Sequence, residues 1–599
     1  MKKILLSIST TVRNPERLPD FLKVLKQLEG QSFSKDNQIK YQILLIQERL
    51  YKPSNIPEEY FSIFNDATKE IPYEVAEKTF HYQDYVGSSI RGRQSANPLN
   101  KLGFAIAKES LDKIIITPIG NMLLKENADV SNIFFNCILK LNFPNPLDTR
   151  EFTEKKGFNI NPFAALLHLL SKVDSLTQTE FSIFIPTLIH FKDIDKYADL
   201  IFKFRKLKTV EDKDIFECSF FKEFYKVAEL DDEQLNNPFE YGDNLMRYFR
   251  LTKYFRVEKS TMGDWRILAE PTRKNEIAQL LTLYDGSAER FSSIDSYLSY
   301  ISDENKPVLP WKRDLSKLKE ITYSLKDIIT SDFNQLTSTL KEKISGKYKS
   351  ITKTDIETLD SDRLEKINSE LRALRLEIIQ LSSNYSLRKN LLELNKILNI
   401  FKDKKLFRAI DPEEFEFLIS KCLQVIDDEI KIAPNLLFDD DGKPIGHAPG
   451  NIPDIECFYH SFNCISEVTL DSSRQQVYRE SMPIMRHLRD FETANSNKPA
   501  YCIFVAPKVH NDTVEYFWVS INHGFQGKKQ KIVPLSLVNF INILDIYTKI
   551  IKDGREFNHK HLMALFDLIV EEGATNSSSI AWLENINNII EEWKGEIIK

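Results

Sequence analysis

The sequence predicts a multidomain α+β protein with three regions, and three observations lead to this expectation. The chain has 599 residues, several times the length of a typical domain. Its middle part, from Lys312 to Ile410, has no proline and a single glycine, as expected of long helices. On either side, helical patterns mix with short strands. We therefore expect separate regions at residues 1–305, 306–405 and 406–599.

The composition is typical of a soluble globular protein. Hydrophobic residues make up 42% and charged residues 28%, and no apolar run approaches the roughly 20 residues needed to cross a bilayer. The apolar stretch after Met1 ends within a few residues without a cleavage signature, so we expect a cytoplasmic protein. Six cysteines form neither a disulfide framework nor a zinc motif, which predicts reduced and mostly buried thiols. The net charge of −6 does not suggest nucleic-acid binding, but an acidic domain can hide a basic face.

The middle region has the clearest periodicity. Apolar residues recur three and four positions apart from Leu364 to Leu381, which places them on one stripe of a long helix. A weaker stripe runs from Leu315 to Ile329. Ser345-Gly346-Lys347 is expected to turn the chain between the two helices. The pattern predicts a helical hairpin or small bundle that separates two working domains.

Three segments of the N-terminal region predict winged-helix-like subdomains. The first has a helix at residues 100–111 and a strand from Lys113 that runs into a turn at Gly120. The second has a helix at 164–173, a capped turn and a second helix. The third has a helix at 244–256 and a strand at 265–268. Together they predict a region that reads DNA.

Polar and basic residues of this region are candidates for contact with DNA. Arg13 and Arg17 flank an Asn-Pro pair, and Arg91, Arg93 and Gln94 belong to a Gly/Ser-rich stretch that we interpret as a flexible loop. Two arginines on such a loop suit contact with phosphates or bidentate recognition of guanine. A solvated loop without a ligand is the alternative.

Two acidic residues of the C-terminal region could share a metal ion. Asp454 opens one short strand, and residues 462–469 alternate as a second strand with Glu467 near its end. A hairpin would bring the two carboxylates together, where they repel each other unless a cation lies between them. Oxygen ligands suit Mg²⁺, which can activate water and orient a scissile phosphate. This is the layout of the PD-(D/E)xK nucleases.

Position 469 departs from that layout, because Thr469 stands where a lysine is expected. Threonine cannot supply a positive charge, so a neighbouring residue replaces the lysine or the site is inactive. The candidates for this role are Glu480, Arg474, Arg486 and His487. Pro483 predicts a helix with Ser481 as its cap, which places Glu480 just before the helix and His487 in its second turn.

The segments around this hairpin complete the predicted nuclease core. A helix is expected from Asp411, where acidic residues suit the positive helix N-terminus. Glu416 differs because it lies between two phenylalanines, and many nucleases of this fold place a glutamate on the first helix, pointing at the metal. Residues 501–507 and 532–535 predict buried strands, and 537–549 predict a helix.

Several blocks of the sequence together resemble the AlwI family of type IIS restriction endonucleases and its strand-nicking relatives. The blocks lie at residues 9–17, 91–103, 446–454, 466–469, 480–487 and 501–507. The resemblance implies an N-terminal recognition domain of winged-helix type, a helical linker and a C-terminal nuclease domain. It implies a short asymmetric DNA site with cleavage a few base pairs to one side.

The resemblance also assigns roles to residues at matching positions. The active-site set that it implies is Glu416, Asp454, Glu467, Glu480 and His487, with the first three as expected Mg²⁺ ligands. The relatives also carry Glu-Val-Thr, so Thr469 does not indicate an inactive enzyme. One set of carboxylates cuts one strand, and cutting the second strand then requires a transient homodimer or a small partner subunit.

Alternatives remain open at this point. The nearest are a strand-specific nicking endonuclease and the large subunit of a heterodimeric restriction enzyme. From other classes, the alternatives are a DNA-binding regulator with a degenerate nuclease domain and a helical scaffold that binds only protein.

Overall fold

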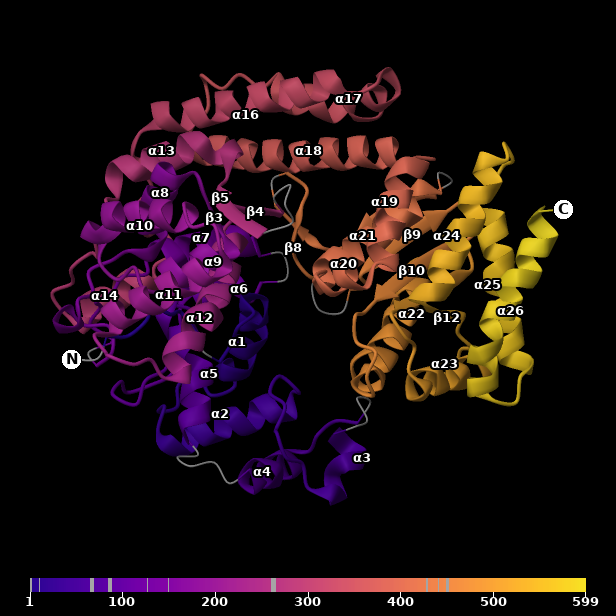
Figure 1. Ribbon diagram of the computed structural model, residues 1–599, viewed down its shortest axis with the longest axis horizontal. Coiled ribbons are helices and arrows are strands. Elements are labelled where there is room, and N and C mark those ends of the chain that lie inside the picture. The colour runs from indigo at the N-terminus through magenta and orange to yellow at the C-terminus, as the bar shows by residue number, and fades with distance from the viewer. Residues whose placement is uncertain are drawn as a thin grey trace. The chain divides into compact units, whose positions relative to one another are not determined.

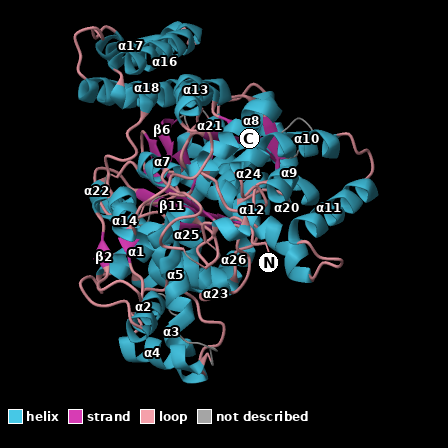
Figure 2. Cartoon of the chain, turned by 90° about the vertical axis from the view of Figure 1, so that its left-hand side faces the viewer, coloured by secondary structure: helices cyan, strands magenta, loops and turns pink. Residues whose placement is uncertain are grey.

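The computed structural model describes residues 3–9, 11–64, 69–83, 89–125, 128–148, 150–259, 265–426, 429–439, 441–448 and 452–598. The expected mixture of helices and sheets is confirmed, and helices predominate (Figures 1 and 2). The chain forms two compact units. Unit 1 comprises Met1–Phe61, Ile71–Asn334 and Gly346–Leu374, and unit 2 comprises Ser62–Glu70, Gln335–Ser345 and Arg375–Lys599.

The first part of unit 1 is mostly helical. Its helices are α1 (Leu18–Lys26), α2 (Lys35–Gln47), α4 (Tyr73–Tyr82), α5 (Ser89–Lys101), α6 (Pro118–Leu123) and α7 (Val130–Leu139). Gly92 lets α5 approach α2 closely, because a Cβ there would lie 1.9 Å from the Gln38 carbonyl oxygen. Arg91 and Arg93 lie in α5, so the prediction of a flexible loop is wrong for them. Gly87 and Ser88 lie outside the described residues.

The predicted helix at residues 100–111 is also wrong in extent. Helix α5 ends at Lys101, and Gly103 turns the chain with φ at +75°. Two short antiparallel strands follow, β1 (Ala105–Ile106) and β2 (Ile115–Ile116). The side chain of Thr117 then caps α6 by accepting a hydrogen bond from the Gly120 N–H.

The second and third predicted segments share one sheet. Antiparallel strands lie in the order β3 (Ser175–Thr177), β5 (Trp265–Ala269) and β4 (Phe255–Lys259). Helices α8 (Pro162–Val173), α9 (Gln178–Phe184) and α12 (Asp232–Leu251) pack around it. The predicted pair of helices with a capped turn is confirmed, since Thr177 and Glu180 form a capping box at the start of α9. The remaining helices before residue 314 are α10 (Ile194–Arg205), α11 (Val210–Tyr225), α13 (Lys274–Leu283), α14 (Ile294–Ser302) and α15 (Pro310–Arg313).

Three long helices occupy the middle region, namely α16 (Leu315–Gln335), α17 (Ser338–Thr352) and α18 (Ser361–Leu387). The predicted apolar stripe is confirmed in α18, where Leu364, Leu371, Leu374 and Ile378 are buried. The predicted turn at residues 345–347 is wrong, because these residues continue α17 and the chain turns before and after that helix. A glycine alone does not end a helix whose neighbours are good helix formers.

Unit 2 contains a mixed five-stranded sheet in the order β12-β11-β10-β9-β6. Its strands are β6 (Glu429–Pro434), β9 (Ile455–Tyr459), β10 (Asn463–Val468), β11 (Ala500–Ala506) and β12 (Ile532–Ser536). Strands β6, β9 and β10 are antiparallel, and β10, β11 and β12 are parallel. The predicted hairpin and both later strands are confirmed. Cys457 and Cys464 are buried and lie opposite each other in the hairpin.

Helices and a small hairpin surround this sheet. The helices are α19 (Leu391–Lys402), α20 (Lys404–Arg408), α21 (Pro412–Val425), α22 (Met482–Ala494), α23 (Asn511–His523), α24 (Leu537–Lys552), α25 (His559–Thr575) and α26 (Ser579–Ile598). The small hairpin has strands β7 (Leu437–Phe438) and β8 (Pro444–Gly446). Across the described ranges, no helix combines the length and apolar character needed to cross a bilayer.

The predicted cap of α22 is wrong. A π-helical segment, Val477–Ser481, runs directly into α22, so Ser481 has helical backbone angles. Its buried hydroxyl has no hydrogen-bond partner among the described residues. Such π segments often occur at functional sites, and this one contains Glu480.

Candidate active site

Asp454 and Glu467 meet where β9 begins and β10 ends. Ile455 is opposite Ser466 in the ladder, so the two acidic residues are the next positions along the hairpin. The Val468 N–H donates to Asp454 Oδ2 over 2.8 Å, which fixes the aspartate against the end of β10. Glu467 is buried and Asp454 is half-buried. The hairpin therefore brings together the two residues that the sequence predicted.

Burial and mutual repulsion make these carboxylates costly to ionise. Burial raises the pKa of Asp454 well above its usual range, and the charges of Glu467 and Glu416 raise it further. Burial likewise raises the pKa of Glu467, with a contribution from Glu480. Four carboxylates from α21, the hairpin and the π segment thus act on one another. A bound cation would relieve this repulsion.

Glu416 reaches the group from α21. Asp411 caps this helix by accepting from the Glu414 N–H, and Pro412 occupies the first turn, where it is favoured. His447 Nδ1 lies 3.0 Å from Glu416 Oε1. Glu416 Oε2 is buried and has no hydrogen-bond partner among the described residues. The contact with His447 joins residues 31 positions apart, so no sequence pattern predicted it.

His487 contacts the opposite side of the pair. Its Nδ1 lies 2.8 Å from Glu467 Oε1, and both side chains are largely buried. Burial and the nearby Arg486 charge lower the pKa of His487, so its imidazole is neutral at neutral pH. An ionised Glu467 can only accept a hydrogen bond, which places the proton on Nδ1 and leaves a lone pair on Nε2.

Thr469, at the position of the expected lysine, interacts with Glu480. Burial raises the pKa of Glu480 to about 7, and the hydrogen bond with the Thr469 side chain acts in the opposite direction. Arg474, another candidate to replace the lysine, pairs instead with Asp512 over 3.1 Å, and the charge of Arg486 acts on His487.

The carboxylate oxygens of the site are suitable ligands for a divalent cation. Within the described ranges, no three His, Cys, Asp or Glu side chains are already arranged as a metal-binding group. The site does offer several carboxylate oxygens that act on one another, as hard cations prefer, and one of them, Glu416 Oε2, is buried with no partner in the part of the chain that the structure describes. The residues that could hold such an ion are Asp454, Glu467 and Glu416.

The residues of the site lie within a match to a known protein family. A model of the AlwI restriction endonuclease matches residues 100–543, which include the whole carboxylate group and His487. The chain belongs to the AlwI restriction endonuclease family. It is therefore a site-specific deoxyribonuclease that binds DNA and hydrolyses its backbone. The match begins after Arg91 and Arg93, so it includes neither of them.

Solved structures give weaker similarities, and the comparison with curated proteins gives no match. The small subunit of the heterodimeric restriction endonuclease R.BspD6I is 22% identical, with a TM-score of 0.28 over 32% of this chain and 98% of that chain. The BpuJ1 endonuclease binding domain in complex with modified DNA is 12% identical, with a TM-score of 0.30 over 51% of this chain and 97% of that chain. Restriction endonuclease FokI is 11% identical, with a TM-score of 0.22 over 94% of this chain and 99% of that chain.

The candidate DNA-contacting residues of this AlwI-family chain differ in their exposure and in their contacts within the protein. Arg13 pairs with Glu240 over 2.8 Å at the surface. Arg17 donates to the Leu50 carbonyl and lies over the ring of Phe21. Arg91 and Arg93 are exposed on the first turns of α5, and Gln94 is half-buried beside them. Arg13 and Arg17 therefore have defined contacts within unit 1.

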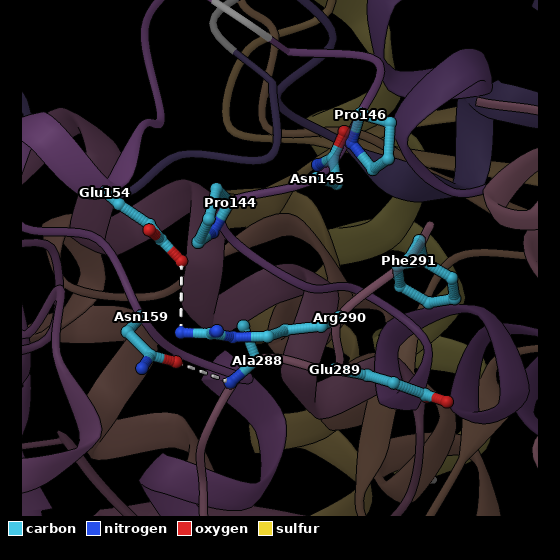
Figure 3. Close-up of a pocket in the computed structure, with 9 residues that line it drawn as sticks. All are labelled: Pro144, Asn145, Pro146, Glu154, Asn159, Ala288, Glu289, Arg290 and Phe291. Atoms are coloured by element: carbon cyan, nitrogen blue, oxygen red, sulfur yellow. Dashed lines mark hydrogen bonds and ion pairs between the residues drawn. The ribbon is translucent and has the colours of Figure 1, made fainter. Parts of the chain in front are cut away.

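A cavity of about 250 Å³ in unit 1 is a separate feature (Figure 3). Its lining residues are Pro144, Asn145, Pro146, Glu154, Asn159, Ala288, Glu289, Arg290 and Phe291. Arg290 pairs with Glu154 over 3.4 Å, and Asn159 accepts from the Ala288 N–H over 3.0 Å (Figure 3). The cavity contains none of the predicted site residues, and its arginine already has an acidic partner.

The raised pKa of Glu480 predicts how the stability of the metal-free protein depends on pH. Its pKa is about 7 in the folded state against 4.5 when unperturbed, so the folded protein holds this proton more tightly. The resulting stabilisation is complete below the unperturbed pKa and is lost as the pH rises through about 7. Between pH 4 and pH 8, the free energy of unfolding should therefore fall by about 3 kcal/mol more in the wild type than in Glu480→Gln. Urea denaturation in EDTA measures this. Glu456→Gln is the control, and the same pH dependence in wild type and Glu480→Gln would contradict the assignment.

Proposed function

We propose that this AlwI-family enzyme is a type IIS restriction endonuclease that uses Mg²⁺. It recognises a short asymmetric site in duplex DNA and cuts a few base pairs outside it. The observation that carries the proposal is the group of buried and half-buried carboxylates around Asp454 and Glu467, whose repulsion a divalent cation would offset. In this proposal residues 1–305 recognise DNA, 306–405 form the linker, and 406–599 form the nuclease domain.

Local structure supports a division between recognition and cleavage. The sheet β3-β5-β4 with α8, α9 and α12 has the composition of a winged-helix-like subdomain, in which a helix can enter the major groove. In unit 2, the antiparallel pair β9-β10 continues into the parallel strands β11 and β12, with α21 ahead of the sheet. We interpret this as a PD-(D/E)xK-like core in which Thr469 replaces the lysine.

Each residue of the site has a role in this mechanism. Asp454, Glu467 and Glu416 would hold the ion, which when bound supplies a Lewis acid and an activated water. When Glu467 is ionised, as it would be on a bound cation, His487 donates to it from Nδ1, and the Nε2 lone pair can accept a proton from water or pass one on. Glu480 titrates near neutral pH, so it can also exchange a proton at working pH. Together these groups replace the single lysine of related sites.

Metal removal tests the proposal directly. Wild-type enzyme should cut plasmid DNA in Mg²⁺, lose all cutting in EDTA and regain it when Mg²⁺ is added in excess. Cutting that persists in EDTA would exclude the metal-dependent mechanism. Specific binding without cutting in either Mg²⁺ or Mn²⁺ would instead favour the DNA-binding regulator with a degenerate nuclease domain.

Arg91 and Arg93 are expected to contact DNA from the exposed start of α5. If either reads a base, its replacement by alanine should cost roughly 1–3 kcal/mol of specific binding and relax specificity at one position. If it contacts phosphate, binding should weaken for all sequences. The slope of log affinity against log salt concentration should then become shallower by about one. Binding titrations at several salt concentrations distinguish the two. Arg363→Ala, an exposed arginine on α18, is the control. Unchanged affinity and salt dependence would remove both arginines from the interface.

A further inference from the structure

His447, which the proposed mechanism does not use, bridges two acidic residues of α21. Its Nδ1 lies 3.0 Å from Glu416 Oε1, and its Nε2 lies 3.3 Å from Glu413 Oε1. Glu413 and Glu416 are three positions apart, so they share one face of the helix. Both carboxylates are largely buried, whereas the His447 side chain is 36% exposed. Both ring nitrogens therefore face carboxylates of α21.

The bridge controls how Glu416 is oriented. Without the His447 contact the Glu416 carboxylate could rotate, because its other oxygen, Oε2, has no partner among the described residues. The charge of Glu416 acts on Asp454, Glu467 and Glu480, so its carboxylate lies within electrostatic reach of all three. A contact that fixes Oε1 also fixes the direction of Oε2. Glu413 fixes the imidazole from its other nitrogen.

The backbone that carries His447 is itself held in place. His447 directly follows β8, and Asp439 in the β7–β8 hairpin accepts from the N–H groups of Asp441 and Lys443, each over 2.9 Å. Asp441 forms a largely buried ion pair of 2.8 Å with Arg375 at the C-terminal half of α18. At Gly442, with φ at +76°, an added Cβ would lie 3.0 Å from Ile379. The hairpin therefore packs closely on α18.

We propose that His447 is a positioning residue of the nuclease site. It holds the Glu416 carboxylate so that the free oxygen faces the group around Asp454 and Glu467, and the β7–β8 hairpin fixes the imidazole. The inference rests on the proposed function, because it assigns Glu416 to the metal-binding set. Contacts of this kind orient the side chains that bind a metal, and their loss typically costs about 10–100-fold in metal affinity or activity.

The test uses the full chain and a plasmid that the wild-type enzyme cuts in Mg²⁺. We expect His447→Ala to lower the single-turnover cutting rate about 10–100-fold and to raise the Mg²⁺ concentration for half-maximal rate. Affinity for the plasmid site in Ca²⁺ and the melting temperature should stay at wild-type values. His447→Asn retains an N–H near the position of Nδ1, and its rate should lie closer to wild type. His460→Ala, an exposed histidine in the β9–β10 turn, should cut at the wild-type rate.

Two results would overturn the inference. One is a wild-type rate and Mg²⁺ dependence in His447→Ala. The other is a loss of rate that matches a loss of folding or DNA binding, with no rescue by asparagine. If His447→Ala does not fold, Glu413→Ala removes the second anchor and should show the same shift in Mg²⁺ dependence, whose absence would also overturn the inference. If wild-type enzyme cuts no DNA in Mg²⁺, the proposed function fails instead.

Discussion

Replacing Asp454 or Glu467 by alanine is expected to lower the rate of DNA cutting by on the order of 10³-fold or more. Each change removes an oxygen ligand from the site that would hold the ion. Specific DNA binding should survive, because the proposed recognition region lies in residues 1–305. Single-turnover cutting in Mg²⁺ and binding in Ca²⁺ measure the two effects separately.

Stability provides the control for these variants. Glu467 is buried, Asp454 is half-buried, and both repel their neighbours when ionised in the metal-free protein, so alanine should leave the melting temperature in EDTA unchanged or higher. Glu456→Ala changes a carboxylate in β9, two positions after Asp454, and should cut at the wild-type rate. Near-wild-type cutting by Asp454→Ala or Glu467→Ala would exclude this site as the catalytic centre.

A plasmid with one recognition site is expected to accumulate as open circles before linear product forms. The described residues supply one group of proposed catalytic carboxylates, so we expect one molecule to hydrolyse one strand at a time. We expect the second strand to be cut slowly, through transient association of two molecules. The second step should therefore accelerate when enzyme is added beyond saturation of the site. Gel analysis of product forms over time measures both steps.

The alternatives give different product patterns. Linear product without open circles at the lowest enzyme concentration would indicate a pre-formed dimer. Open circles that never become linear would identify a strand-specific nicking endonuclease, or a large subunit that lacks its partner. Asp454→Ala mixed with wild-type enzyme adds a control, since it should occupy sites without cutting and slow the second step.

The local chemistry of the chain predicted several elements correctly. The alternation around Glu467 specified a buried strand, and Asp411 with Pro412 specified the start of α21. The errors occurred at glycines, which do not end a helix by themselves. Arg91 and Arg93 lie in α5, which packs on α2 at Gly92, and residues 345–347 continue α17 through Gly346.

The candidate site was predictable only in part, for a related reason. Asp454 and Glu467 are 13 positions apart and a hairpin joins them, so the sequence pattern could place them together. The contact of His447 with Glu413 and Glu416 depends on how the β7–β8 hairpin packs against α21. No periodicity records such a contact. The hydrogen bond between Thr469 and Glu480 was not predictable either, because Glu480 lies in the π-helical segment before α22.

Sequencing the DNA ends made by wild-type enzyme in Mg²⁺ tests the central claim most directly. The claim is that one part of the chain reads a short asymmetric site and the group around Asp454 and Glu467 cuts outside it. Early in the reaction, ends should map to one strand, at a fixed distance to one side of a single short asymmetric sequence. Ends within the recognised sequence, or scattered without any common sequence nearby, would contradict the claim.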